Sequence, residues 1–137
     1  MNVGATSRKH RVFPRDSASA RAVREFVTTE LRALAAPPDV VDDVRLAVSE
    51  LAANAIEYGL AAEIEVWVGA DTDGWEIEVV GAADPGAHLP GTERWAVAGS
   101  AATSGRGLGI VRQLMDEAFV TETGGRIAVR CVRRRRD

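Results

Sequence analysis

The sequence is poor in cysteine, lysine, aromatic residues and long apolar runs, and each scarcity excludes a class of protein. Cys131 is the only cysteine, so the chain forms neither an internal disulfide nor a multi-cysteine metal site. No apolar run approaches the roughly 20 residues of a membrane helix. The basic N-terminal residues are not followed by the apolar segment that a secretory signal requires. We therefore expect a cytoplasmic protein that does not contact membranes.

Charge and aromatic content also narrow the function. Lys9 is the only lysine, so the glycine-lysine-serine/threonine sequence of a classical P-loop is absent. Twenty acidic residues against 17 Lys and Arg give a net charge of −3, and aromatic residues make up 5%. This balance argues against direct nucleic-acid binding. The exception is the run Arg133–Arg136, which we interpret as a solvated tail, with a nucleic-acid or acidic-partner contact as the alternative.

What remains is the composition of an ordinary globular protein. The 137 residues, 46% of them hydrophobic and 27% charged, suffice for one domain with its own core. We expect a single domain over residues 1–137, with residues 1–10 and 133–137 as flexible tails.

The hydrophobic periodicity changes along the chain from strand to helix and back. Alternating residues and turn signals predict two hairpins, one on each side of a long loop and a helix. Cys131 falls on the apolar face of the second hairpin, which predicts a buried core residue. The expected elements are a strand at 10–14, helices within 15–34 and at 39–58, strands at 62–69 and 75–80, a loop at 83–104, a helix directly after the glycines at 105–109, and strands at 118–123 and 126–132.

The expected order of elements is β-α-α-β-β-loop-α-β-β. Most strands are hairpin partners, so we predict a mixed, mostly antiparallel sheet. Helices would cover one face of this sheet, which makes the fold class an α+β two-layer sandwich.

A polar stripe runs along the second predicted helix. Glu50, Asn54 and Glu57 are spaced i, i+4 and i+7 and share one face, and Asp43 falls close to the same line. A carboxylate and an amide one turn apart can supply a proton acceptor and hard oxygen ligands for a magnesium nucleotide. The alternative is an ordinary solvated helix face.

A glycine stretch precedes the third predicted helix. Gly105, Gly107 and Gly109 alternate with other residues, and free backbone N–H groups at a helix start favour an anion. Arg106 adds a charged donor. The alternative is that the glycines only allow a turn and tight packing.

Together these segments resemble the GHKL ATPases. "LAVSELAANAIEYG" (46–59) looks like their N box, and "SGRGLGIVRQLMDE" (104–117) looks like their second glycine box. The small size and the "FPRD" segment followed by a helix are most similar to the anti-sigma-factor serine-protein kinases. The resemblance covers about residues 11 to 132.

The resemblance implies a Bergerat (histidine-kinase-like ATPase) fold that uses ATP and Mg²⁺. Glu50 would be the catalytic base that activates a partner's serine, and Asn54 would bind Mg²⁺. The implied function is an anti-sigma factor that phosphorylates a STAS-type anti-sigma-factor antagonist, and so controls an alternative sigma factor. The family often dimerises, so a homodimer is open. Residues 87–104 would form the ATP lid, and the phosphate-binding residues would be Gly105, Arg106, Gly107, Leu108 and Gly109.

One position departs from the family pattern. The adenine-recognising aspartate of a D-x-G motif should follow the strand "WEIEVV", but the register places Gly81 there. Asp84-Pro85-Gly86 spells D-x-G three residues later, and an odd offset turns a side chain to the opposite face. Either a bulge brings Asp84 and Gly86 into the site, or the chain is a non-catalytic binding module with degenerate or lost ATP binding.

Overall fold

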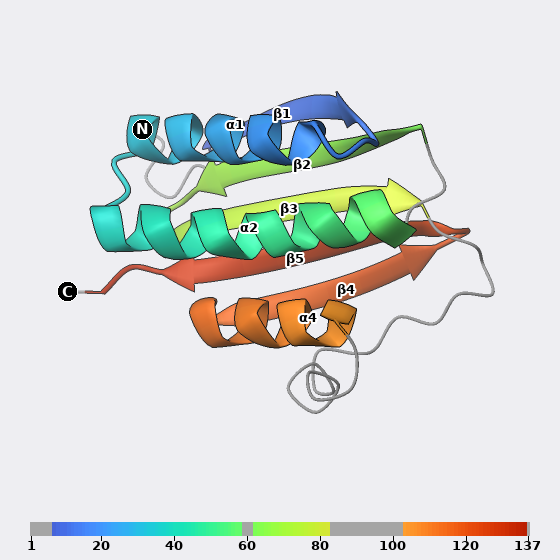
Figure 1. Ribbon diagram of the computed structural model, residues 1–137. Coiled ribbons are helices and arrows are strands. Elements are labelled where there is room, and N and C mark those ends of the chain that lie inside the picture. The colour runs from blue at the N-terminus through green and yellow to red at the C-terminus, as the bar shows by residue number, and fades with distance from the viewer. Residues whose placement is uncertain (1–6, 59–61, 83–102, 137) are drawn as a thin grey trace.

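The computed structural model describes residues 7–58, 62–82 and 103–136 (Figure 1). Within these ranges the order of helices and strands matches the sequence prediction, whereas residues 83–102, which include most of the expected loop and ATP lid, lie outside them. The elements are β1 (Ser7–Pro14), α1 (Ser19–Ala33), α2 (Pro38–Tyr58), β2 (Glu63–Ala70), β3 (Gly74–Ala82), α4 (Thr103–Leu114), β4 (Glu117–Thr123) and β5 (Arg126–Arg134).

The strands form one sheet in the order β1-β2-β3-β5-β4. The three helices of the described residues lie on the same face: α1 packs on β1 and β2, α2 on β3 and β5, and α4 on β4 (Figure 1). This confirms the predicted α+β two-layer sandwich. The expected mixed sheet is, within the described residues, antiparallel at every pairing. The reason is that the second hairpin joins the first through β5, which runs opposite to β3.

Alternation along the strands fills the layer between sheet and helices. Ile64, Val66 and Val68 of β2 are fully buried, and so are Ile77 of β3 and Cys131 of β5, as the pattern predicts. Each such aliphatic side chain contributes about 1.5–3 kcal/mol on burial. The sheet therefore carries its core on one face only.

The turn of the second hairpin is made by two consecutive glycines. Gly124 and Gly125 have φ values of 58° and 84°. Two consecutive residues with positive φ form the turn type that suits the right-handed twist of a hairpin, and glycine adopts it without strain. The predicted pairing of 118–123 with 126–132 is thus confirmed and extended.

The helices begin close to their expected positions. Asp16, three residues before the start of α1, accepts a hydrogen bond from the backbone N–H of Ser19 at 3.2 Å. Asp39 lies in the first turn of α2, which begins one residue before the expected start at 39. None of the helices in the described ranges is long and apolar enough to cross a membrane.

The glycine stretch is helical, which corrects the prediction of a helix that begins only after it. Helix α4 starts at Thr103 and includes Gly105, Gly107 and Gly109. A glycine costs about 1 kcal/mol relative to alanine inside a helix but does not prevent it. Burial of Val111 on the same helix compensates, and Met115, the residue after the helix, is buried in the same core.

The tails expected at residues 1–10 and 133–137 are corrected in part, since residues 1–6 and 137 lie outside the described residues. Residues 7–10 are part of β1, and residues 133 and 134 complete β5. Alternation of the strand turns Arg133 inward, where it is 8% exposed. Arg134 pairs with Glu117 at 2.6 Å, and Arg136 pairs with Asp116 at 2.8 Å. Arg135 donates to the backbone carbonyl oxygen of Asp71 at 3.3 Å.

Candidate functional site

Helices α2 and α4 lie side by side and run in opposite directions (Figure 1). Arg133 of β5 fixes this arrangement. Its Nη1 donates hydrogen bonds to Asp43, in the second turn of α2, and to the carbonyl oxygen of Leu114 at the end of α4, the latter at 3.2 Å. Because the start of α2 meets the end of α4, the second half of α2 lies beside the glycine-rich first half of α4.

The polar stripe is on the side of α2 that faces α4. Asp43 shows the direction, because its carboxylate reaches Arg133 between the two helices. Glu50 and Asn54 follow at seven and eleven residues, about two and three turns further along the same side. Both are half-buried, whereas Glu57 is exposed. The stripe is therefore not a uniformly solvated face.

Asp43 differs from the rest of the stripe. Its ion pair with the buried Arg133 uses its carboxylate for structure. The part of the stripe available for chemistry is therefore Glu50 with Asn54, as the resemblance implies.

The first half of α4 suits an anion. The first four N–H groups of a helix have no partner within it, and the aligned peptide dipoles make this end positive. The backbone of this half is not covered by side chains at three positions, Gly105, Gly107 and Gly109. The side chains of residues 101–108, including Arg106 and Leu108, lie outside the described part of the chain.

The oxygen donors of α2 fit a magnesium nucleotide. Within the described ranges no group of three or more His, Cys, Asp or Glu side chains could hold a metal ion alone. Mg²⁺ bound with a nucleotide needs only one or two protein oxygens, because phosphates and water complete its coordination. The amide oxygen of Asn54 can supply one of them.

The opposite end of the site is at Gly81, where the described part of β3 offers no acidic side chain toward the helices. Strand β3 pairs with β5 without interruption as far as Ala82 opposite Arg126, so no bulge occurs in β3. Gly81 faces the helices, and a Cβ there would have the Cβ of Ala55 of α2 at 3.7 Å as its nearest described neighbour. Asp84 and Gly86, the alternative base-reading residues, lie outside the described residues.

Sequence reasoning missed two arginines that hold α2 in place. One is Arg133, which the sequence analysis interpreted as part of a solvated tail. The other is Arg15 of the "FPRD" segment, whose Nη1 donates to the carbonyl oxygen of Ile56 at 3.0 Å and whose backbone N–H donates to Ala62 at 2.8 Å. A cation on the last carbonyls of a helix is a common C-terminal cap. Neither contact could be predicted from the sequence, because the partners are 41 and 90 residues apart.

Comparison with known proteins shows which family this chain belongs to. The model of the histidine kinase-like ATPase domain matches residues 13–132. The fold is similar to the crystal structure of the RsbU and RsbW domains of Rv1364c from Mycobacterium tuberculosis, with a TM-score of 0.70 and 20% identity. That match covers 93% of this chain and 32% of the other, so this chain spans about a third of that one. No curated protein matches the chain. Since the family model spans both the helix stripe and the glycine stretch, the chain belongs to the histidine kinase-like ATPase domain family.

Proposed function

We propose that this protein is an anti-sigma factor and ATP-dependent serine-protein kinase, acting in the cytoplasm on an anti-sigma-factor antagonist. The observation that carries the proposal is the placement of Glu50 and Asn54 on the side of α2 that faces α4. Membership of an ATPase domain family supports nucleotide use. The similarity to a chain that contains an RsbW domain is one of fold.

The roles follow from the chemistry of each group. Glu50 would accept the proton of the antagonist's serine hydroxyl as its oxygen attacks the terminal phosphate of ATP. Asn54 would hold Mg²⁺, which when bound offsets the negative charge of the phosphates. The N–H groups at the start of α4 would donate to the phosphate oxygens. Phosphoryl transfer depends chiefly on positioning and charge neutralisation, so these few groups suffice.

The regulatory consequence is an exchange of partners. An unphosphorylated antagonist of the STAS type would bind the kinase. Once its serine carries a phosphate, the antagonist would leave, and the kinase would be free to sequester the sigma factor. The family resemblance leaves homodimerisation open, and a homodimer would present two partner-binding surfaces.

Calorimetry with ATP and Mg²⁺, followed by labelled phosphate transfer to a purified antagonist, tests the proposal. We expect Glu50→Gln to keep partner binding and to lose about 10²–10⁴-fold in transfer rate, the usual contribution of a general base. Asp42→Asn is the matched control, because Asp42 is an exposed carboxylate on the same helix. Absence of ATP binding in the millimolar range would refute the kinase assignment.

The glycine at position 81, where the family pattern has an aspartate, favours a second candidate, a regulatory module that binds partners without nucleotide. A Cβ at Gly81 would lie at ordinary contact distance, 3.7 Å, from the Cβ of Ala55, so a substitution there can be tested. For this candidate the wild type does not bind ATP, and Gly81→Asp gains binding by adding an acceptor for the adenine amino group. Gly81→Ala, which adds volume without an acceptor, should stay inert. Robust binding by the wild type would eliminate the candidate.

A further inference from the structure

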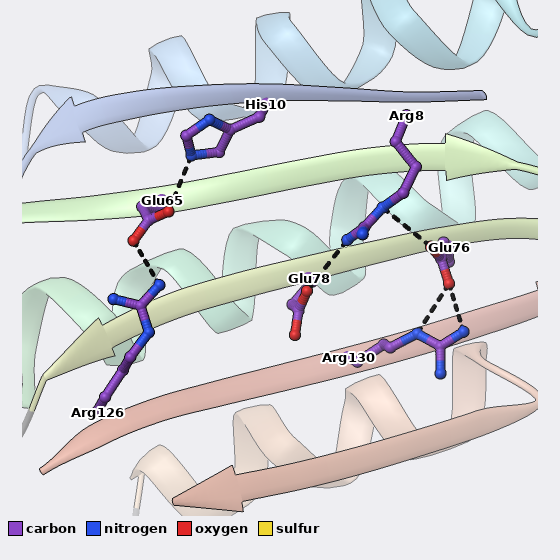
Figure 2. A network of polar contacts seen from close by, with 7 residues as sticks. All are labelled: Arg8, His10, Glu65, Glu76, Glu78, Arg126 and Arg130. Carbon is purple, nitrogen blue, oxygen red and sulfur yellow. Dashed lines mark hydrogen bonds and ion pairs between the residues drawn. The ribbon is translucent and has the colours of Figure 1, made fainter. Parts of the chain in front are cut away.

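The sheet face away from the helices carries a ladder of ion pairs, shown in Figure 2. Glu76 accepts from Arg130 at 2.6 Å and lies 3.4 Å from Arg8, which also donates to Glu78 at 3.2 Å. Most of this face is therefore neutralised by its own side chains. The ladder consists of Arg8, His10, Glu65, Glu76, Glu78, Arg126 and Arg130.

A hollow of about 470 Å³ lies at the end of this ladder, where β2 begins and β3 ends. This is within the roughly 300–1,000 Å³ of typical ligand pockets. Val12, Val80 and Ala82 provide apolar lining, and the turn Gly124–Gly125 forms one wall. A Cβ at Gly124 would meet no described atom within 4 Å, so the missing side chains leave the space open.

The charges that line the hollow do not balance. Glu65 is bound twice, by Arg126 at 2.7 Å and by His10 at 2.9 Å. Partial burial alone would raise the pKa of Glu65, but the hydrogen bonds and charges of Arg126 and His10 bring this pKa below its ordinary value. Glu65 thus remains ionised, and its carboxylate pairs with the guanidinium of Arg126. Glu63 also lines the hollow, and no cation pairs with it among the residues that the structure describes.

We propose that this hollow binds an arginine or lysine side chain presented by a partner protein. The aliphatic stem of such a residue would lie on Val12 and Val80, and its charged head would reach Glu63. Val12 is 42% exposed, so it gains from being covered. Two carboxylates against one guanidinium repel an anion. The charged residues that line the hollow lie on the opposite sheet face from α2 and α4, and of the candidate nucleotide site only Gly81 borders it, so its occupation is measured separately from the proposed kinase function.

The test is an NMR titration of the full chain that follows the backbone amides of Gly124 and Gly125. N-acetyl-arginine amide is the probe, and N-acetyl-citrulline amide, which has the same shape without the charge, is the matched ligand. We expect saturable shifts in the millimolar range with the arginine probe and much smaller shifts with citrulline. Glu63→Gln should weaken the arginine probe about three- to fivefold, as expected for an exposed ion pair. Glu25→Gln on α1 should leave it unchanged.

Two results overturn the proposal. Equal shifts with the arginine and citrulline probes, or equal affinities in Glu63→Gln and Glu25→Gln, would show that the charge of Glu63 selects nothing. Shifts of the same amides that depend on protein concentration without any probe would place a second copy in the hollow instead of a different partner. Neither result bears on ATP binding, which is measured separately.

Discussion

Removal of the carboxylate of Asp43 should destabilise the protein more than removal of its partner Arg133. The side chain of Arg133 is 9% exposed and that of Asp43 is 35% exposed. In Asp43→Ala, the arginine keeps only Leu114 at 3.2 Å and Asp39 at 3.8 Å, so a nearly buried charge loses its main counterion. We expect a cost of about 3–5 kcal/mol.

In Arg133→Met, the remaining carboxylate is partly hydrated, and methionine fills much of the vacated volume. The expected cost is therefore smaller, about 1–3 kcal/mol. The double variant should be more stable than the two single costs predict, because no unpaired charge is left in it. A coupling energy of about 1–3 kcal/mol is expected for groups in direct contact.

Urea unfolding followed by circular dichroism measures these free energies. Asp42→Ala is the matched control, because Asp42 is exposed and its loss should stay within about 0.5 kcal/mol. Repeating the measurement at high salt tests whether the pair is buried, since salt screens exposed pairs far more than buried ones. The cost of Asp43→Ala should therefore change little with salt. A cost below about 1 kcal/mol for Asp43→Ala, or additive single variants, would refute the reasoning that Arg133 is held by its ion pair.

Three further predictions concern the core, the response to acid and the first hairpin. Burial raises the pKa of Cys131 to about 12, so a thiol reagent at neutral pH should modify it only after unfolding, and rapid labelling of the native protein would disagree. Burial alone would raise the pKa values of Glu65 and Asp116, but hydrogen bonds and nearby arginines lower them by more. Both pKa values therefore lie below their ordinary values of 4.5 and 3.8. Their stabilisation is present above those ordinary values and is lost as pH falls through the lowered ones; urea unfolding at several pH values should show this, with a smaller loss in Glu65→Gln. Gly74→Ala should cost about 1–3 kcal/mol, because its Cβ would collide with the carbonyl oxygen of Arg133 and lie 2.8 Å from the Cα of Arg134 in β5. Gly124→Ala, whose Cβ would meet no described atom within 4 Å, should cost less in the same assay.

The fold was predictable because its elements have clear periods. Alternation in β2 and β3, the helical spacing of Val23, Val27 and Leu31, and the Gly-Gly turn each specify local structure. These signals are physical consequences of a sheet buried on one face. The order of elements and the two-layer architecture follow from them.

The contacts that join distant segments were not predictable in the same way. A run of four arginines is typical of a solvated tail, and nothing local reveals that Asp43, 90 residues earlier, binds one of them. The glycines of α4 were expected to precede the helix, because glycine has a low helix propensity, but the helix includes them and buries Val111 in the core. In the site, the spacing of Glu50 and Asn54 predicted a common face, but only the fold shows that this face is turned to α4.

Strand β1 has a consequence for how the sheet is specified. Phe13 is the only residue of β1 that is buried, so apolar alternation gives this strand little information about its alignment. Arg8 supplies that information by reaching past β2 to β3, and His10 does so by stacking on Trp67 at 4.2 Å. A slip of one residue would turn both toward the helices. The alignment of β1 thus depends on ion pairs and a ring contact of the exposed sheet face, and salt, which screens exposed ion pairs, should weaken the contribution of Arg8 while the backbone pairing with β2 remains.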